Sequence, residues 1–242
     1  MNDPLVEVKA VTKRYGATVA VNNVSLTIHA GEIYALVGAN GAGKSTLIRS
    51  IVGITVPDSG EVFVCGEDTR RHGARAKRHI GYLPEELTLY ERLTGREYLQ
   101  LVAGLKQRDA PQQIPEALDF FELKGVAGKW VGGYSLGMRK KLGLAAAMLG
   151  APHVLVLDEP LNGLDVEMMR KLRERITAER QTGRALIISS HVMDFVERVA
   201  DRVGIMSGGQ LVAEGSPQAL RKQSGLHQSS FEDVFFRLAK SK

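Results

Sequence analysis

Hydrophobic and polar residues alternate near the start of the chain, and this alternation predicts strands. It covers residues 5–11 and 19–28, which are separated by a short turn. Residues 33–37 form a continuous apolar run, the pattern expected of a buried parallel strand. Strand character returns at residues 61–64, after a turn that contains proline and glycine. The first part of the chain is therefore predicted to be β structure.

The spacing changes to that of helices between residues 94 and 149. Apolar residues there recur every three or four positions, at Leu99, Val102, Leu105, Ile114, Leu118 and Phe121. After Gly150 the pattern alternates again, with strands expected at 154–157 and 185–189 and helices at 166–180 and from Val192. Such alternation favours a mainly parallel sheet with crossover helices.

These patterns predict one α/β domain that spans residues 1–242. Its core is expected to comprise residues 1–87 and 151–215. A helical subdomain is expected at residues 88–150 and a short helical tail at residues 216–242. A chain of 242 residues is long enough to bury a core of this size.

Composition excludes several classes of protein. Hydrophobic residues make up 44% of the chain and charged residues 24%, the balance of a globular rather than a disordered protein. The single cysteine, Cys65, rules out an intrachain disulfide and offers no metal-ligand pattern in the sequence. The N-terminus shows no secretory signal, and no apolar run reaches the roughly 20 residues of a bilayer-spanning helix. We therefore expect a soluble chain.

The net charge of +5 allows a nucleic-acid or lipid partner but does not require one. Basic residues are scattered along the chain, apart from a cluster within residues 70–78 and pairs such as Lys140-Lys141. We interpret most of them as solvated surface and expect no nucleic-acid partner. A membrane-facing role for the cluster within 70–78 stays open as an alternative.

A phosphate-binding loop is predicted between the apolar run at 33–37 and the helix that follows it. Gly38, Gly43, Lys44 and Ser45 match the pattern G-x-x-x-x-G-K-[ST] in that context. Glycines let backbone N–H groups turn inward around phosphate oxygens, and the helix N-terminus adds partial positive charge. We expect Lys44 to reach the β- and γ-phosphates and Ser45 to hold Mg²⁺. The predicted nucleotide-binding residues of the loop are Gly38, Ala39, Asn40, Gly41, Ala42, Gly43, Lys44, Ser45 and Thr46. The alternative is a glycine-rich turn that only caps a helix.

Two acids end the apolar run at 154–157. Asp158 and Glu159 precede Pro160, and ligands of open α/β sheets bind at the carboxyl ends of the strands. Asp158 is expected to hold Mg²⁺, whereas Glu159 is expected to orient or deprotonate the attacking water. Alone, such a pair could merely begin a turn. Beside a phosphate loop it predicts an ATPase.

The segment Tyr-Ser-Leu-Gly-Met-Arg at residues 134–139 resembles the signature loop of ABC ATPases, and it lies where that family has it. Other family marks follow in order. Tyr15 resembles the aromatic residue that stacks on adenine, Glu85 occupies the Q-loop position, Asp165 resembles the D-loop aspartate, and His191 resembles the switch histidine. Alternatives for single marks are a turn tyrosine, a surface acid after Pro84 and a helix-capping histidine.

Two positions depart from the family pattern. Leu136 stands where the family's signature usually has the first of two glycines, although Ser135 and Gly137, which would contact the γ-phosphate, are kept. Glu85 stands where the family usually has glutamine, and this carboxylate could still approach Mg²⁺. Three segments resemble those of the exporter branch that handles drugs, antibiotics, lipids or polysaccharides. They are the signature loop, residues 82–85 and residues 231–235.

The resemblance implies an α/β fold of defined layout. It comprises a P-loop NTPase core with a mainly parallel sheet, an N-terminal antiparallel β subdomain and a helical ABC-specific subdomain. It also implies ATP and Mg²⁺ as cofactors, with Glu159, His191 and Lys44 as the catalytic residues. Ser135 of one copy would complete the nucleotide site of a second copy in a homodimer, and Asp165 would couple the two sites.

The resemblance further implies a transmembrane permease as partner and a place at the cytoplasmic face of the membrane. The same type of ATPase subunit also drives importers, so an import ATPase is the first alternative. A non-transport ABC ATPase and a module that senses ATP without hydrolysing it are further alternatives.

Overall fold

The computed structural model describes residues 3–106 and 113–240 and contains two sheets. The strands are β1 (Val6–Tyr15), β2 (Thr18–Ile28), β3 (Ile33–Gly38), β4 (Ser59–Val64), β5 (Glu67–Asp68), β6 (Ile80–Leu83), β7 (Val154–Asp158), β8 (Ala185–Ser189), β9 (Arg202–Ser207) and β10 (Gln210–Gly215). The α-helices are α1 (Lys44–Ile51), α2 (Gly73–Arg78), α3 (Gly95–Leu105), α4 (Gln113–Phe120), α5 (Leu136–Met148), α6 (Val166–Gln181), α7 (Met193–Val199), α8 (Pro217–Ser224) and α9 (Phe231–Ala239). Two short 3-10 helices, η1 (Lys124–Val126) and η2 (Val131–Gly133), precede α5.

The larger sheet has six strands in the order β10-β9-β3-β8-β7-β6. All neighbouring pairs are parallel except β9 and β10, which form an antiparallel hairpin at one edge. All residues of β3, β7 and β8 are buried, which explains why these segments are continuous apolar runs. The smaller sheet, β2-β1-β4-β5, is antiparallel throughout. The predicted α/β class, with a mainly parallel sheet and an antiparallel N-terminal sheet, is confirmed.

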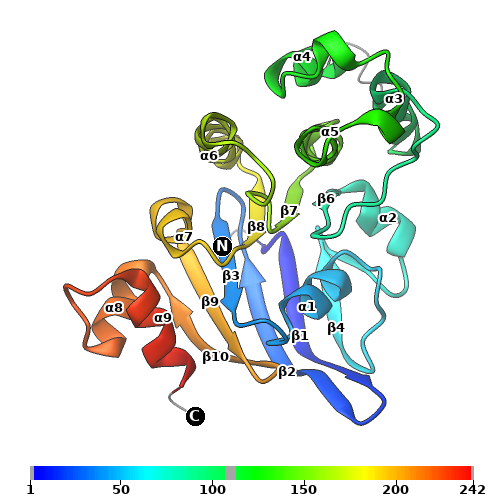
Figure 1. Ribbon diagram of the computed structural model, residues 1–242. Coiled ribbons are helices and arrows are strands. Elements are labelled where there is room, and N and C mark those ends of the chain that lie inside the picture. Colours follow the sequence, from blue (N-terminus) through cyan, green and yellow to red (C-terminus); the bar gives the residue numbers. More distant parts are fainter. Residues whose placement is uncertain (1–2, 107–112, 241–242) are drawn as a thin grey trace.

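Helix α1 lies between the two sheets (Figure 1). Its buried residues Leu47, Ile48 and Ile51 pack with apolar residues of both sheets in one core cluster. On the other face of the large sheet, α5 and α6 contribute to a second cluster, and α8 and α9 pack in a third cluster beside β9. This layering places the end of β3 and the start of α1 at the carboxyl edge of the sheet.

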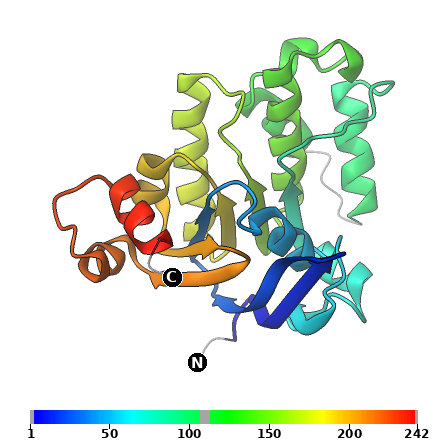
Figure 2. The ribbon, with the colours of Figure 1, turned by 60° about the horizontal axis from the view of Figure 1, so that its bottom comes forward.

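Helices α3, α4 and α5 group together at one end of the molecule, away from the antiparallel sheet (Figures 1 and 2). Helix α3 has a well-defined start, because Thr94 and Glu97 form a reciprocal capping box at its N-terminus. Leu99 and Leu118 are buried in the cluster that these helices share with the large sheet. Part of the helical subdomain predicted at 88–150 lies outside the described residues, and its boundaries stay a prediction.

Helices α8 and α9 form the tail that was predicted to be helical. Ser216 and Ser230 cap them through their hydroxyls, which accept hydrogen bonds from Ala219 N and Asp233 N. Strands β5, β6, β9 and β10 and helix α2 have no counterpart among the predicted elements. Strand β6 has only four residues, including Gly81, so its own apolar period is too short to read.

No helix among the described residues is both long and apolar enough to cross a bilayer.

Candidate active site

The loop between β3 and α1 bends through conformations that favour glycine. Gly41 and Gly43 have φ values of 79° and 102°, in the left-handed region. A Cβ atom on Gly43 would lie 2.2 Å from the carbonyl oxygen of Ala20, so no larger residue fits there. Gly43 also precedes the first residue of α1, so the helix N-terminus points its free N–H groups into the loop.

The side chain of Lys44 bonds back to the start of the same loop. Its Nζ donates hydrogen bonds to the carbonyl oxygens of Gly38 at 2.6 Å and Ala39 at 3.2 Å. The ammonium group is therefore held over the loop, where a phosphate chain would give it stronger, charge-assisted bonds.

A cavity of about 400 Å³ opens at this loop. It is lined by Ala20, Asn40, Gly41, Ala42, Gly43, Lys44, Ser45, Thr46, Glu85, Asp158 and Glu159. Ten of these eleven residues belong to the predicted site, and Ala20 of β2 is the addition. The cavity brings one helix N-terminus and one ammonium group together with three carboxylates, a combination whose chemistry fits a polyphosphate and a divalent cation.

Asp158 ends β7 and is 2% exposed. The Ser189 hydroxyl, at the end of the neighbouring strand β8, donates a hydrogen bond to Asp158 Oδ1. The same hydroxyl accepts a hydrogen bond from the backbone N–H of Glu159 at 2.9 Å. Ser189 thus orients both acids, and the sequence offers no local pattern that reveals this role.

Glu159 adopts an unusual backbone conformation for a residue with a side chain. Its φ is 47°, a left-handed value that costs free energy and persists only where the surrounding structure imposes it. The carboxylate is buried, and its Oε2 lies 2.9 Å from Nδ1 of His191. The predicted base and switch histidine, 32 positions apart in the chain, are therefore in direct contact.

Two further side chains near the acids were not predicted. Burial, reinforced by the Asp158 carboxylate, raises the pKa of Tyr82 on β6 to about 12. Lys140 of α5 is 5% exposed, and burial lowers its pKa. The charges of Asp158, Glu159 and Glu85 oppose this shift, so Lys140 lies within electrostatic reach of all three.

Tyr15 lies apart from the cavity lining. It ends β1, is 50% exposed, and has the Lys13 ammonium group 5.5 Å from its ring centroid. An exposed ring at the end of a strand is free to stack on a flat ligand, and its adenine-binding role stays a prediction.

Ser135 and Gly137 also lie apart from that lining, at the N-terminus of α5. The exposed Ser135 caps the helix, since its hydroxyl accepts a hydrogen bond from Met138 N at 3.2 Å. A Cβ atom on Gly137 would lie 3.0 Å from the carbonyl oxygen of Gly163, so the signature loop abuts the segment that leads to Asp165. Leu136, between them, is 77% exposed.

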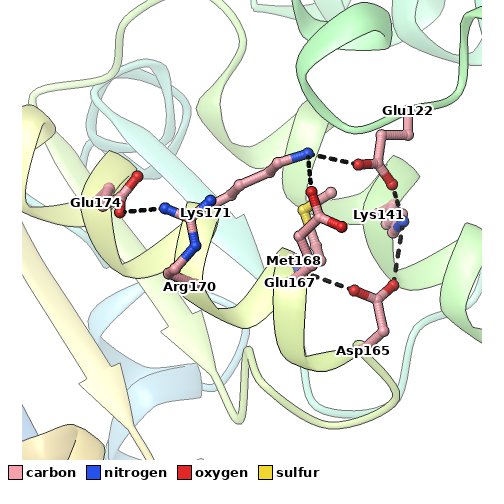
Figure 3. A network of polar contacts seen from close by, with 8 residues as sticks. All are labelled: Glu122, Lys141, Asp165, Glu167, Met168, Arg170, Lys171 and Glu174. Carbon is pink, nitrogen blue, oxygen red and sulfur yellow. Dashed lines mark hydrogen bonds and ion pairs between the residues drawn. The ribbon is translucent and has the colours of Figure 1, made fainter.

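Asp165 belongs to a polar network that joins α5 and α6 (Figure 3). Its Oδ1 caps α6 by accepting a hydrogen bond from Met168 N, and this bond is the main cause of its lowered pKa. Its Oδ2 lies 3.5 Å from Nζ of Lys141. Glu122 bridges Lys141 and Lys171 at 2.7 Å each, and these bonds lower the pKa of Glu122. The network ties Asp165 to the helix that carries the signature loop.

Comparison with known proteins gives related sequences. The family model described as ABC transporter matches residues 21–162, and a model of an AAA domain matches residues 130–196. The Nod factor export ATP-binding protein I of Rhizobium sp. (strain N33) is 37% identical over 223 residues, which are 91% of this chain and 73% of that protein. The probable multidrug ABC transporter ATP-binding protein YbhF of Escherichia coli (strain K12) is 33% identical over 242 residues, 98% of this chain and 42% of that protein.

Solved structures share the fold. A structure of the ATP binding subunit of an ABC transporter has a TM-score of 0.93 and 31% identity, covering 98% of this chain and 100% of that one. A dimeric ATP-binding cassette in a post-hydrolysis state with ADP and Pi has a TM-score of 0.81 and 24% identity, covering 87% of this chain and 98% of that one.

Proposed function

The chain belongs to the family of ABC transporter ATP-binding proteins, and we propose how its own residues bind ATP, hydrolyse it, and pass the resulting change to a second copy and to a permease. The observation that carries the proposal is that Lys44, Ser45, Asp158 and Glu159 line one and the same cavity. A loop that only capped a helix would need neither the buried acids nor His191 beside them.

The residues of the cavity fit Mg²⁺ together with ATP. The Ser45 hydroxyl and the Asp158 and Glu85 carboxylates are hard oxygen donors, the type that Mg²⁺ prefers. One oxygen of Asp158 accepts from Ser189, which leaves the other for the ion. When bound, Mg²⁺ supplies charge neutralisation on the phosphates. Lys44 and the N–H groups at the start of α1 hold the phosphate chain, and Tyr15 stacks on the adenine.

Glu159 acts as the base of hydrolysis, and His191 positions it. The carboxylate is buried, so it keeps one orientation, and its contact with His191 limits that orientation further. A carboxylate at this place accepts the proton of the attacking water, or orients that water toward the γ-phosphate. His191 is exposed and follows β8, so it can exchange its contact with Glu159 for one with the γ-phosphate.

Two copies pair face to face around ATP. Ser135 and Gly137 do not line the cavity of their own chain, and both lie near the exposed Leu136. Their donors are therefore available to the γ-phosphate held by a second copy, as in the helix N-terminus sites that bind anions. Asp165, tied to the signature helix through Lys141, would report the state of one site to the other.

Replacing Ser135 by aspartate tests this pairing. Aspartate is as good a helix cap as serine, so α5 is expected to stay intact, but its charge repels the γ-phosphate. With a non-hydrolysable ATP analogue, we expect dimers of the wild-type chain and at least about 10-fold weaker dimerisation of the variant. Light scattering after gel filtration measures the dimer. Ser216→Asp, at the cap of α8, is the matched control. Wild-type pairing by Ser135→Asp, or pairing that ignores ATP, would contradict the arrangement.

The paired ATPases drive a transmembrane permease from the cytoplasmic face of the membrane. Glu85 and the segment 87–94 that follows it connect the nucleotide cavity to α3, so they can pass a change at the phosphates to a docked permease helix. Export is favoured because relatives at 37% and 33% identity are named as an export and a multidrug protein. The sequence of the signature loop, residues 134–139, also resembles that of the exporter branch.

Purification of the chain with its membrane partner distinguishes export from the rival functions. We expect a tagged chain, extracted in mild detergent, to bring down an integral membrane protein and no solute-binding protein. In sealed vesicles with the ATPase outside, ATP should then drive substrate inward, which corresponds to export from the cell. Association with a solute-binding protein would indicate import. Salt-sensitive retention of nucleic acid would indicate a non-transport ATPase.

A further inference from the structure

A cysteine and two histidines meet at the edge of the large sheet, far from one another in the sequence. The Sγ atom of Cys65 and one ring nitrogen each of His79 and His153 lie within 4.8 Å of one another. The Nδ1 atoms of the two histidines are 3.2 Å apart. A single cysteine gives no metal-ligand pattern in the sequence, yet folding places three ligand atoms together.

The sheet register explains the meeting of the two histidines. His79 directly precedes β6 and His153 directly precedes β7, and Ile80 pairs with Val154 in these parallel strands. The cluster therefore lies at the amino ends of the two strands. The opposite, carboxyl ends lead to Glu85 and to Asp158, so the cluster is separate from the nucleotide cavity.

Cys65 reaches the histidines from the other sheet. It lies in the two-residue turn between β4 and β5, where Val64 pairs with Glu67. Cys65 and Gly66 have φ values of 50° and 78°, and this type of turn favours asparagine, aspartate or glycine at its first position. Cysteine has no conformational reason to occupy a left-handed position. Such a departure from local preference is often found where a side chain has a function.

The spacing of the two histidine nitrogens matches that of a transition-metal site. In a tetrahedral site with metal–nitrogen distances of about 2.0–2.1 Å, two nitrogens lie roughly 3.3 Å apart. The observed 3.2 Å between the histidine nitrogens is close to that value. Cys65 is half-buried and His153 is exposed, so an ion can enter from solvent and keep a water as fourth ligand.

We propose that Cys65, His79 and His153 bind one Zn²⁺-class transition-metal ion, which clamps the β4–β5 turn to the starts of β6 and β7. On binding, the Cys65 thiol gives up its proton to solvent and its thiolate sulfur bonds the metal, while both imidazoles bind in their neutral form. A set of two nitrogens and one sulfur selects zinc, cobalt or copper over Mg²⁺ and Ca²⁺. The ring that donates the hydrogen bond between the two Nδ1 atoms changes to its other neutral tautomer, with the proton on Nε2, so that both Nδ1 atoms can bond the ion.

Burial raises the pKa of the Cys65 thiol, so the metal-free site holds a neutral thiol. Metal binding must displace this proton, so the affinity for the ion is expected to increase with pH.

Cobalt(II), a spectroscopic substitute for zinc, tests the site in the full-length chain without nucleotide and with excess Mg²⁺. Cys65 is the only cysteine of the chain, so any thiolate-to-cobalt charge-transfer absorption reports this residue alone. We expect the absorption to saturate at one cobalt per chain and to disappear when zinc is added. Zinc should also raise the midpoint of thermal unfolding.

Three variants complete the test. Cys65→Asn suits the turn and should fold normally, but it should lose the absorption and the zinc-induced rise in the unfolding midpoint. His153→Ala removes an exposed ring and should weaken cobalt binding by at least about 10-fold. His29→Ala, at an exposed histidine in the turn after β2, should behave as the wild type. The proposal is overturned if the wild type shows no charge-transfer absorption, if His153→Ala binds cobalt as the wild type does, or if the absorption arises only in metal-bridged dimers.

Discussion

Replacing Glu159 by glutamine is expected to lower the rate of ATP hydrolysis by about 10²–10⁴-fold while leaving ATP binding intact. The amide has the size of the carboxylate and can keep the contact with His191, but it cannot accept a proton from water. Removing a buried charge also lowers the negative charge beside the phosphates. ATP should therefore stay bound, and a closed dimer should accumulate.

Two measurements check this prediction. Phosphate release gives the rate, and light scattering with ATP gives the dimer fraction. Glu174→Gln is a matched control, since Glu174 is exposed on α6 and pairs only with Arg170 among the contacts of the described residues. Normal turnover by Glu159→Gln, in preparations free of contaminating ATPase, would remove Glu159 from the role of base.

Replacing Lys44 by alanine is expected to weaken ATP binding by about 10- to 150-fold, the loss of one charge-assisted contact of about 1.5–3 kcal/mol. The same change removes the two hydrogen bonds that Nζ donates to Gly38 and Ala39. The loop then loses two internal hydrogen bonds as well as a phosphate ligand. The rate of hydrolysis should fall together with the affinity for ATP, because the γ-phosphate is no longer held in position next to Glu159.

Titration with a fluorescent ATP analogue measures the affinity, and thermal unfolding checks that the fold persists. Lys77→Ala removes an exposed lysine from α2 and serves as control. If Lys44→Ala bound ATP within twofold of the wild type, Lys44 would not be a phosphate ligand.

Contiguous segments could be predicted well because their information is local. The predicted phosphate loop is a pattern of glycines, a lysine and a serine at fixed spacing, and all of these residues lie within one short segment. The buried strand before Asp158 is an apolar run that no exposed segment would carry. The recurrence of apolar residues every three or four positions, around Leu99 and again around Leu118, likewise predicted α3 and α4.

Contacts between distant segments could not be predicted in this way. Ser189 orients Asp158 and Glu159 only because β7 and β8 are neighbours in the sheet. Lys140 comes near the acids only because α5 packs against the strands that carry them. Both side chains look ordinary in the sequence, as a serine at a strand end and one half of a basic pair.

The sequence alone therefore determined the class of fold, the glycine-rich loop before α1 and the acids at the end of β7, because hydrophobic period and glycine spacing act over a few consecutive residues. Only the tertiary structure decided that His191 contacts Glu159, that Glu122 bridges α5 and α6, and that Cys65 meets two histidines. These meetings depend on strand order and register, which arise when separate segments bury their apolar faces together.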